Sequence, residues 1–165
     1  MVIWMMGLSR AGKSTLSNLL YNKLKPEVSN LVLLDGDAIR ILFNSDVDHS
    51  IEGRRVNAER ISKLCKFLSD QNINVIAAVL SIFPEWQDWN RKNIKKYQEV
   101  YIKASMESLE KRDTNNLYSQ AKKGLIKNVV GYDIPFPEPK KPDLIIENDD
   151  ETSNFESMLE RILLL

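Results

Sequence analysis

Residues 2–20 read VIWMMGLSRAGKSTLSNLL, and this stretch decides how the fold begins. Its first five residues are apolar and stop at Gly7, a pattern typical of a short buried strand. The residues after Gly12 continue as a helical pattern, with apolar positions at Leu16, Leu19, Leu20 and Leu24. The predicted order is a strand, a glycine-bounded loop and a helix.

The loop matches the phosphate-binding pattern G-x-x-x-x-G-K-[ST], with the strand before it and the helix after it that the pattern requires. Backbone N–H groups and the helix N-terminus surround a triphosphate with partial positive charge in such a loop. Lys13 is expected to reach the terminal phosphates, and Ser14 to offer its hydroxyl to Mg²⁺. A chance glycine-rich turn is the alternative. The predicted ATP-binding residues of the loop are Gly7, Leu8, Ser9, Arg10, Ala11, Gly12, Lys13, Ser14 and Thr15.

Further apolar runs alternate with helical patterns along the chain. The runs predict strands at Leu31–Leu34, Val75–Leu80, Val100–Ile102 and Leu144–Ile146. Helical spacing predicts helices between them, and an amphipathic helix from Phe155 closes the chain. The sequence therefore predicts an α/β fold of the doubly wound P-loop NTPase type, with a mainly five-stranded parallel sheet flanked by helices. Ligands bind such a sheet outside the carboxyl ends of its strands.

The segment from Asn115 to Pro142 interrupts this alternation. It has few apolar runs, three lysines near Gly124 and four of the six prolines of the chain. We interpret residues 115–135 as a mobile lid and the remainder as an ordered proline-rich return. Residues 1–165 as a whole are predicted to form one P-loop domain, because 165 residues are about the length of a single domain.

Composition excludes several classes of protein. Lysine plus arginine and aspartate plus glutamate both number 23, so the net charge is zero and a nucleic-acid partner is not expected. The single cysteine, Cys65, can form no intrachain disulfide and is interpreted as a core residue. The sequence shows no signal-peptide pattern and no run of about 20 apolar residues. We therefore expect no membrane partner and a cytoplasmic location.

Two carboxylates, in Asp35-Gly36-Asp37, follow the second predicted strand, next to the phosphate-binding loop. One carboxylate at this place can orient or deprotonate an acceptor hydroxyl, while its neighbour holds Mg²⁺ through water. The alternative is that an aspartate only caps the helix that contains Ile39 to Phe43.

Arginines gather after these carboxylates. Arg40 lies one helical turn beyond Asp37 and is expected to point into the same cleft. The start of the next helix carries Arg54, Arg55, Asn57 and Arg60. Such a cluster alone is typical of a solvated face, but beside a phosphate site it favours anion binding, because guanidinium groups match phosphate oxygens.

Three further residues have less specific patterns. His49 is the only histidine, and a surface position is its default interpretation. Trp86 and Trp89 follow the third predicted strand. We interpret both as packing or lid contacts rather than as a platform for a nucleotide base, because aromatic side chains mainly contribute buried area.

Together these residues resemble the adenylylsulfate kinase family over nearly the whole chain. The loop is similar to the GLSxxGKST segment of the family, and Leu34–Arg40 matches its LDGDxxR segment. Ser50, Arg54 and Asn57 follow its S-x-x-D-R-x-x-N spacing, with glycine at position 53 in place of the aspartate. More specific matches, to the lid and return pattern KRD…GLYxxAxxGxIKxxxGxDxPxEPP, are Glu110–Asp113, Leu117–Tyr118, Ala121–Gly124, Ile126–Lys127 and Gly131–Pro139.

The resemblance implies a kinase that moves the γ-phosphoryl group of ATP, with Mg²⁺, to the ribose 3′-hydroxyl of a nucleotide with a 5′ phosphoanhydride. It implies that Asp37 is the general base, that Lys13 is also catalytic, and that Arg112 belongs to the ATP site. The implied metal ligands are Ser14 and Asp35. The implied acceptor-binding residues are Asp35, Arg40, His49, Arg54, Asn57, Lys127 and Val129.

Ser81 matches the serine of an S-P-Y segment that is described in some members of the family as a phosphoserine position. We include Ser81 among the catalytic candidates and interpret it first as a residue that lines the cleft. The physical reason is that direct in-line transfer with Asp37 and Mg²⁺ needs no covalent intermediate.

The departures from the family pattern concern the acceptor. Family members usually hold the acceptor adenine between two phenylalanines, and the matching positions here are His49 and Val129. The S-P-Y segment has become Ser81-Ile82-Phe83, and Pro84 replaces the arginine that follows. Stacking contributes about 1–3 kcal/mol per base, and a smaller base loses less when a two-sided aromatic contact is absent. These changes favour a pyrimidine.

We therefore narrowly favour cytidine 5′-diphosphoramidate as the acceptor, the substrate of a relative of this family in bacterial capsule pathways. Adenylyl sulfate, phosphorylated in sulfate assimilation, is the alternative. A more remote alternative is a regulator that binds ATP without transferring its phosphate. The expected partner is a small-molecule nucleotide, and dimers are frequent in the family, which makes a homodimer one candidate assembly.

Overall fold

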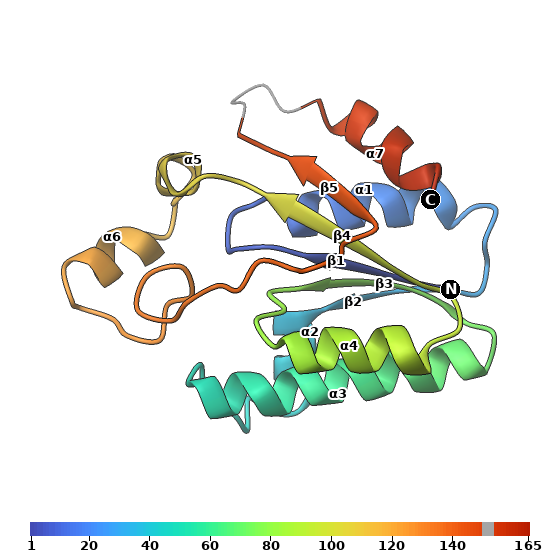
Figure 1. The fold of residues 1–165 in the computed structure, drawn as a ribbon, viewed down its shortest axis with the longest axis horizontal. Coiled ribbons are helices and arrows are strands. Elements are labelled where there is room, and N and C mark those ends of the chain that lie inside the picture. The colour runs from blue at the N-terminus through green and yellow to red at the C-terminus, as the bar shows by residue number, and fades with distance from the viewer. Residues whose placement is uncertain (150–153) are drawn as a thin grey trace.

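The computed structural model describes residues 1–149 and 154–165 and confirms the predicted architecture. Five parallel strands form one sheet in the order β2-β3-β1-β4-β5 (Figure 1). The strands are β1 (Val2–Met6), β2 (Leu31–Asp35), β3 (Asn74–Val79), β4 (Tyr97–Lys103) and β5 (Leu144–Glu147). The helices are α1 (Lys13–Leu24), α2 (Gly36–Leu42), α3 (Ile51–Asp70), α4 (Pro84–Asn93), α5 (Met106–Lys111), α6 (Leu117–Lys122) and α7 (Phe155–Leu163).

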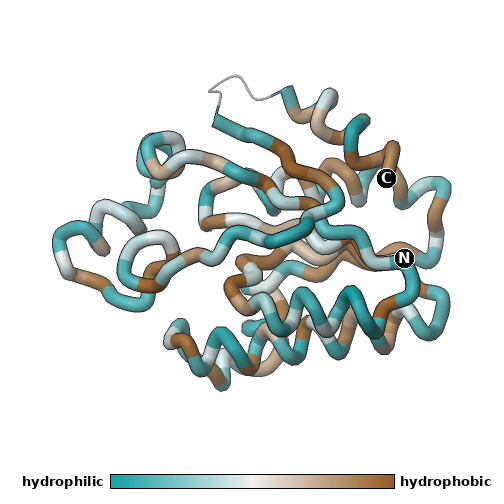
Figure 2. The backbone as a smooth tube through the Cα atoms, in the orientation of Figure 1, coloured by the Kyte–Doolittle hydropathy of each residue, from teal (hydrophilic) through white to brown (hydrophobic). Residues whose placement is uncertain are grey.

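Helices cover both faces of the sheet. Helices α1 and α7 lie on one face, and α2, α3 and α4 lie on the other (Figure 1). Because the two faces of β1 are both buried, alternate residues feed two separate cores: Ile3 and Met5 pack beneath α1 and α7, while Trp4 and Met6 pack toward α3. Figure 2 shows the matching pattern, with hydrophobic strands inside and a largely hydrophilic α4 at the surface.

The free thiol of Cys65 belongs to the second core and is fully buried, as the sequence predicts. Burial raises its pKa to about 12, so the group stays protonated and unreactive. No helix among the described residues has the length and apolar character that crossing a membrane requires.

The structure shifts the bounds of several predicted strands and contains two helices that the sequence analysis did not predict. Strand β4 begins at Tyr97, three residues before the predicted start, and the third predicted strand ends at Val79 rather than Leu80. Helix α4 carries both tryptophans predicted to pack, and their rings lie edge to face at 5.6 Å. Helix α6 lies within the predicted lid, where Asp113 accepts hydrogen bonds from three of its first N–H groups.

The connections after the strands meet at one end of the sheet. Helices α5 and α6 lie beyond the carboxyl ends of the strands, and the proline-rich return runs from there back along the sheet to the start of β5, while both chain termini lie at the opposite end (Figure 1). The loop between Val130 and Ile134 is closed by a bridge between these two residues. The fold therefore gathers the predicted functional segments at the carboxyl end of the sheet, and the mobility of the lid stays a prediction.

Candidate active site

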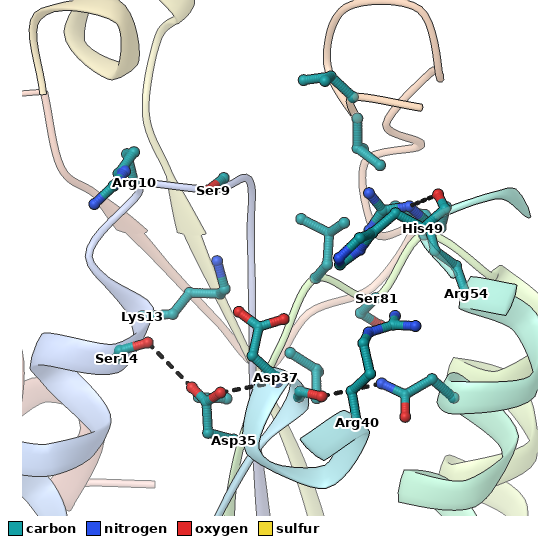
Figure 3. A pocket seen from close by; sticks show the side chains of 18 of the residues that line it. Ser9, Arg10, Lys13, Ser14, Asp35, Asp37, Arg40, His49, Arg54 and Ser81 are labelled. Atoms are coloured by element: carbon teal, nitrogen blue, oxygen red, sulfur yellow. Dashed lines mark hydrogen bonds between the residues drawn. The ribbon is translucent and has the colours of Figure 1, made fainter. Parts of the chain in front are cut away.

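A cleft of about 890 Å³ opens at the carboxyl ends of β1, β2 and β3. Its walls come from the phosphate-binding loop, from α2 and α3, and from the lid (Figure 3). The predicted site residues that line it are Ser9, Arg10, Gly12, Lys13, Ser14, Thr15, Asp35, Asp37, Arg40, His49, Arg54, Asn57, Ser81, Lys127 and Val129. The topology thus brings together residues more than 100 positions apart in the sequence.

The phosphate-binding loop requires glycine at both of its ends. Gly7 has φ of +150°, and a Cβ atom there would collide with the carbonyl oxygen of Ile102. Gly12 has φ of +101°, and a Cβ atom there would lie 2.6 Å from Nδ2 of Asn148. Both conformations are ones that only glycine adopts without strain, so the two glycines allow the loop to curl against the sheet.

Lys13 lies at the base of the cleft. Its Nζ donates a hydrogen bond to the carbonyl oxygen of Leu8, at 2.7 Å, across the loop. Burial lowers the pKa of Lys13 to about 8, although the nearby carboxylates of Asp35 and Asp37 act in the opposite direction. An ammonium in this position is poorly solvated, and a phosphate group can supply the missing anionic partner.

Asp35 serves two purposes at the end of β2. Its Oδ1 accepts hydrogen bonds from the N–H groups of Asp37 and Ala38, so it caps the N-terminus of α2, as the alternative interpretation predicts. Its Oδ2 accepts a hydrogen bond from the hydroxyl of Ser14, at 3.2 Å. This carboxylate and hydroxyl are the hard oxygen donors that Mg²⁺ prefers, and Mg²⁺ typically needs only one or two carboxylates beside phosphate oxygens and water. The residues present therefore fit a magnesium ion.

Asp37 lies in the first turn of α2 and is exposed to the cleft. Figure 3 shows its carboxylate extending toward the ammonium of Lys13, away from the sheet. The capping hydrogen bond to Asp35 uses the main-chain N–H of Asp37. Its carboxylate oxygens are thus directed into the space where a phosphate acceptor must approach, which is the geometry that a general base requires.

Three predicted anion-binding residues also fix the surrounding main chain. The guanidinium of Arg40 is buried and donates to the carbonyl oxygens of Val47 and Asp48, at 2.9 and 2.7 Å. Arg54 donates to His49 O and to Asn128 O of the lid, both at 2.8 Å. The side chain of Asn57 donates to Gly36 O, at 3.1 Å.

Some hydrogen-bonding capacity remains in this group. Nε of Arg40 and Oδ1 of Asn57 are buried and have no hydrogen-bond partner within residues 1–149 and 154–165. By contrast, the neighbouring Arg55 pairs with Glu85, and Arg60 forms two hydrogen bonds with Asp46. The arginine cluster therefore divides: Arg54 and Asn57 face the cleft, while Arg55 and Arg60 belong to the solvated face that was the alternative interpretation.

His49 and Val129, the two positions where the family pattern has phenylalanine, both line the cleft. Burial and the charges of Arg40 and Arg54 lower the pKa of His49, so the imidazole is neutral near pH 7. Val129 is only 4% exposed and packs into the core. The wall that these two residues form is smaller and less aromatic than a pair of phenyl rings.

Ser81 has a strained backbone and a fully engaged hydroxyl oxygen. Its φ is +58°, a left-handed conformation that residues other than glycine rarely adopt. Its Oγ accepts hydrogen bonds from Nε1 of Trp4, at 3.0 Å, and from Nε2 of Gln87, at 3.3 Å. A hydroxyl oxygen has two lone pairs, and both are occupied here, so the hydroxyl can act toward a ligand only as a donor.

The remaining predicted residues do not reach the cleft wall. Arg112 donates to the carbonyl oxygen of Asn148, at 2.8 Å, instead of lining the cleft. Gly7, Leu8 and Ala11 contribute main chain to the loop, and the side chain of Leu8 packs away from the cleft against Gly131.

The structure adds partners that are not among the predicted site residues. Trp4 and Gln87 hold Ser81, while Tyr118 and Asn148 donate to main-chain carbonyls of the loop. Their role depends on contacts between distant segments, which local spacing does not encode.

Comparison with known proteins agrees with this geometry. The sequence model of the adenylylsulphate kinase family matches residues 1–147. The chain belongs to the adenylylsulphate kinase family. It is thus a P-loop kinase, a phosphotransferase whose acceptor is a hydroxyl group, and kinases of this family use ATP.

Individual members of the family differ in their acceptor. Cytidine diphosphoramidate kinase of Campylobacter jejuni is 42% identical to this chain over 163 residues, 98% of this chain and 94% of that protein. A probable adenylyl-sulfate kinase of Archaeoglobus fulgidus is 37% identical over 90% of this chain and 96% of that protein. Among solved structures, the APS kinase CysC of Mycobacterium tuberculosis, in complex with AMPPNP and APS, gives a TM-score of 0.86 at 28% identity, covering 98% of this chain and 94% of that one.

Proposed function

We propose that this kinase transfers the γ-phosphoryl group of Mg-ATP to the ribose 3′-hydroxyl of a nucleotide with a 5′ phosphoanhydride, and that cytidine 5′-diphosphoramidate is the preferred acceptor. The observation that carries the choice of acceptor is the cleft wall at His49 and Val129, which offers no pair of phenyl rings for a purine. The similarity to the cytidine diphosphoramidate kinase of Campylobacter jejuni, at 42% identity, supports the same choice.

In the proposed reaction, the phosphate-binding loop and Lys13 hold the triphosphate, and Mg²⁺ neutralises charge on its terminal phosphates when bound by Ser14 and Asp35. Asp37 accepts the proton of the 3′-hydroxyl as the oxygen bonds to the γ-phosphorus. The bond between that phosphorus and the oxygen bridging to the β-phosphate breaks, and ADP leaves with the electron pair. The proton of the 3′-hydroxyl is then held by Asp37 as a carboxylic acid, and Asp37 releases this proton to solvent after the transfer.

The acceptor end of the cleft supplies the remaining positive charge. Arg40 and Arg54 lie beside the proposed acceptor site, and Lys127 lines the cleft from the lid. Guanidinium and ammonium groups suit the 5′ phosphoanhydride, which carries negative charge on closely spaced oxygens. Because Arg54 already donates to Asn128 O in the lid, a bound anion on Arg54 is coupled to the lid position.

We assign Ser81 a role as a hydrogen-bond donor to the acceptor rather than as a phosphate carrier. A nucleophilic serine needs a base that removes its proton and a free lone pair. The contacts of Ser81 are with two nitrogen donors, Trp4 Nε1 and Gln87 Nε2, and neither can accept that proton. Its remaining O–H bond can therefore only donate.

Adenylyl sulfate is the second candidate acceptor. It is supported by the family relatives that are named as adenylyl-sulfate kinases and by the structural similarity to the mycobacterial APS kinase. A regulator that binds ATP without transfer is less well supported, because Asp37 and the anion-binding arginines are all directed to the same cleft as the phosphate-binding loop.

We further propose a cytoplasmic enzyme that acts as a homodimer. Ile41 and Leu42 of α2 are each 70% exposed, and apolar side chains at a surface favour association. The sedimentation coefficient of the purified protein tests this: a monomer at all micromolar concentrations would rule out the dimer.

The proposed reaction is tested by following ADP release from Mg-ATP with each acceptor and by locating the new phosphate with ³¹P nuclear magnetic resonance. We expect acceptor-dependent ADP release and a phosphomonoester that couples to the ribose H3′ proton. Release of ADP at a rate independent of any acceptor, or a product phosphorylated elsewhere than at the 3′ position, would contradict the proposal.

A further inference from the structure

Two main-chain carbonyls of the phosphate-binding loop receive hydrogen bonds from side chains outside it. The hydroxyl of Tyr118, in α6, donates to the carbonyl oxygen of Ser9, at 2.9 Å. Nδ2 of Asn148, immediately after β5, donates to the carbonyl oxygen of Ala11, at 2.8 Å. The two donors therefore come from different segments, more than 100 residues away along the chain, and hold alternate peptide groups of one loop.

The direction of a peptide carbonyl fixes the direction of the N–H group in the same peptide plane. In a trans peptide, C=O and N–H point to opposite sides. When Tyr118 holds the carbonyl of Ser9 outward, the N–H of Arg10 is turned to the inner side of the loop. Asn148 does the same for the N–H of Gly12 through the carbonyl of Ala11. Converging N–H groups of this kind form the anion-binding concavity of a phosphate-binding loop.

The two donors are held rigidly. Tyr118 is fully buried, and Asn148 is 2% exposed. The main-chain N–H of Asn148 donates to Lys103 O, and its carbonyl oxygen accepts from Arg112, both at 2.8 Å. Burial, with a contribution from Asp113, raises the pKa of Tyr118 to about 12, so its hydroxyl remains a donor throughout the physiological range.

The close approach of Asn148 explains one residue of the loop. A Cβ atom on residue 12 would lie 2.6 Å from Nδ2 of Asn148, so the amide can reach Ala11 O only because residue 12 is glycine. Within residues 1–149 and 154–165, no acceptor is bonded to the N–H of Arg10 or of Gly12. Both N–H groups are thus available to a ligand.

We infer that Tyr118 and Asn148 are positioning residues that orient the N–H groups of Arg10 and Gly12 toward the β- and γ-phosphates of ATP. This inference rests on the proposed use of ATP at the loop. It also divides the predicted lid: α6 is tied to the loop through Tyr118, so any closing movement belongs to the residues that follow α6. Neither residue touches the reacting atoms, and both act through the loop.

The test uses variants that remove only the donated hydrogen bond. Tyr118→Phe removes the hydroxyl, and Asn148→Leu replaces the amide with an apolar group of similar shape. Calorimetric titration measures the affinity of each folded variant for Mg-ADP and for AMP, and thermal unfolding measures stability. We expect each substitution to weaken Mg-ADP binding about tenfold, the usual scale for losing one buried hydrogen bond, and to leave AMP binding unchanged.

Matched controls lie outside the cleft. Tyr132→Phe removes a hydroxyl from a residue that is 46% exposed, and Asn93→Leu removes an amide that donates to Trp89 O on α4, at 2.7 Å. Both controls are expected to bind Mg-ADP as the unsubstituted protein does.

The two levels of proposal fail in different ways. If Tyr118→Phe and Asn148→Leu lower the unfolding temperature but keep full affinity for Mg-ADP, the two residues are merely structural and the inference is overturned. Equal losses of AMP and Mg-ADP affinity would also overturn it, because the loop N–H groups would then not be the cause. Failure of the proposed acceptor instead leaves nucleotide binding intact and abolishes only acceptor-dependent ADP release.

Discussion

Lys13 and Asp37 face one another across the cleft, and their chemistry is divided between binding and transfer (Figure 3). Lys13 is proposed to bind the phosphates of ATP, whose negative charge is present before the reaction. Asp37 is proposed to accept the proton of the acceptor hydroxyl, which moves during the reaction. Two different measurements can therefore separate them, one of nucleotide binding and one of turnover.

Asp37→Asn removes the proton acceptor while keeping the size of the side chain. We expect kcat to fall by about 10²–10⁴, the usual contribution of a general base, while the affinity for Mg-ATP stays unchanged. Rapid-quench measurement of phosphoryl transfer, with calorimetric titration of Mg-ATP, gives both values. A variant that turns over at the rate of the unsubstituted enzyme would show that Asp37 is not the base.

The lowered pKa of Lys13 predicts a pH dependence. Because this pKa is about 8 in the free enzyme, the ammonium predominates below pH 8 and is lost as the pH rises through that value. We expect kcat/KM for ATP to be level at pH 7 and to decline above pH 8 as the positive charge disappears. In Lys13→Arg the residual activity should show no such decline, since an arginine stays protonated. A break near pH 8 in that variant would assign it to another group.

Among single residues, those in motifs of consecutive residues could be predicted from the sequence. Hydrogen-bond partners from distant segments could not. The positions of Lys13, Ser14 and Asp37 follow from short patterns next to strand ends. The hydrogen bonds of Ser81 with Trp4 and Gln87 join three segments, so no local pattern reports them. Arg112 was predicted at ATP from its motif; in the structure it donates to Asn148 O, and its contact with ATP stays a prediction.

Among the structural elements, the lid segment beside the proposed acceptor site is held by the carboxylate of Asp133. The side chain of Asp133 accepts hydrogen bonds from the N–H groups of Asn128 and Val129, at 2.6 and 2.5 Å. Burial opposes ionisation of this side chain, but these N–H donors and the charge of Arg54 lower its pKa overall, so it stays ionised at neutral pH. The carboxylate therefore fixes the segment that follows Lys127.

Asp133→Ala should loosen this segment without disturbing the phosphate-binding loop. We expect the KM for the acceptor to rise about three- to tenfold and the KM for ATP to stay unchanged, because the lost hydrogen bonds lie only on the acceptor side. Initial-rate kinetics with each substrate varied in turn measures both constants. Asp88→Ala, on exposed α4, is the control. An equal rise in both constants would mean that the substitution disturbs the whole cleft.

The elements themselves were predictable where hydrophobic periodicity is strong. Strands β1 and β5 and helix α7 are nearly or fully as predicted, because their apolar residues recur with the period of the structure they form. Helix α4 was missed because its sequence, PEWQDWNRKN, is mostly polar and starts at a proline rather than at a capping hydroxyl. Helix α6 was missed because it has only six residues and depends on Asp113 for its first N–H groups.

In the whole molecule, both faces of the sheet are packed at the central strand β1, whereas the edge strand β5 is buried on one face only, so the stability contributed by a β5 residue should depend on its face. Ile146 of β5 is fully buried in the core under α1 and α7, whereas its neighbour Ile145 is 43% exposed. The two positions differ in burial but share a strand, so they form a matched pair.

Ile146→Ala should lower the free energy of unfolding by about 2–4 kcal/mol, through lost transfer energy and the cavity left behind. Ile145→Ala should lower it by less than about 1 kcal/mol, because that side chain keeps contact with water in the folded state. Urea titration followed by circular dichroism measures both. Equal losses at the two positions would contradict the packing described for β5.

Zero net charge describes the molecule as a whole but not its cleft. Lys13, Arg40, Arg54 and Lys127 line one cavity together with Asp35 and Asp37, so the cleft at the carboxyl end of the sheet has a local excess of positive charge. This arrangement suits a small, multiply charged nucleotide.

The preference of the enzyme for one acceptor is measured by the ratio of two specificity constants. The measurement is kcat/KM with cytidine 5′-diphosphoramidate and with adenylyl sulfate, at the same saturating Mg-ATP concentration. With His49 and Val129 in place of two phenylalanines, we predict a ratio of at least about ten in favour of the cytidine substrate, the scale of one lost stacking contact. A ratio in favour of adenylyl sulfate would show that cytidine 5′-diphosphoramidate is not the preferred acceptor.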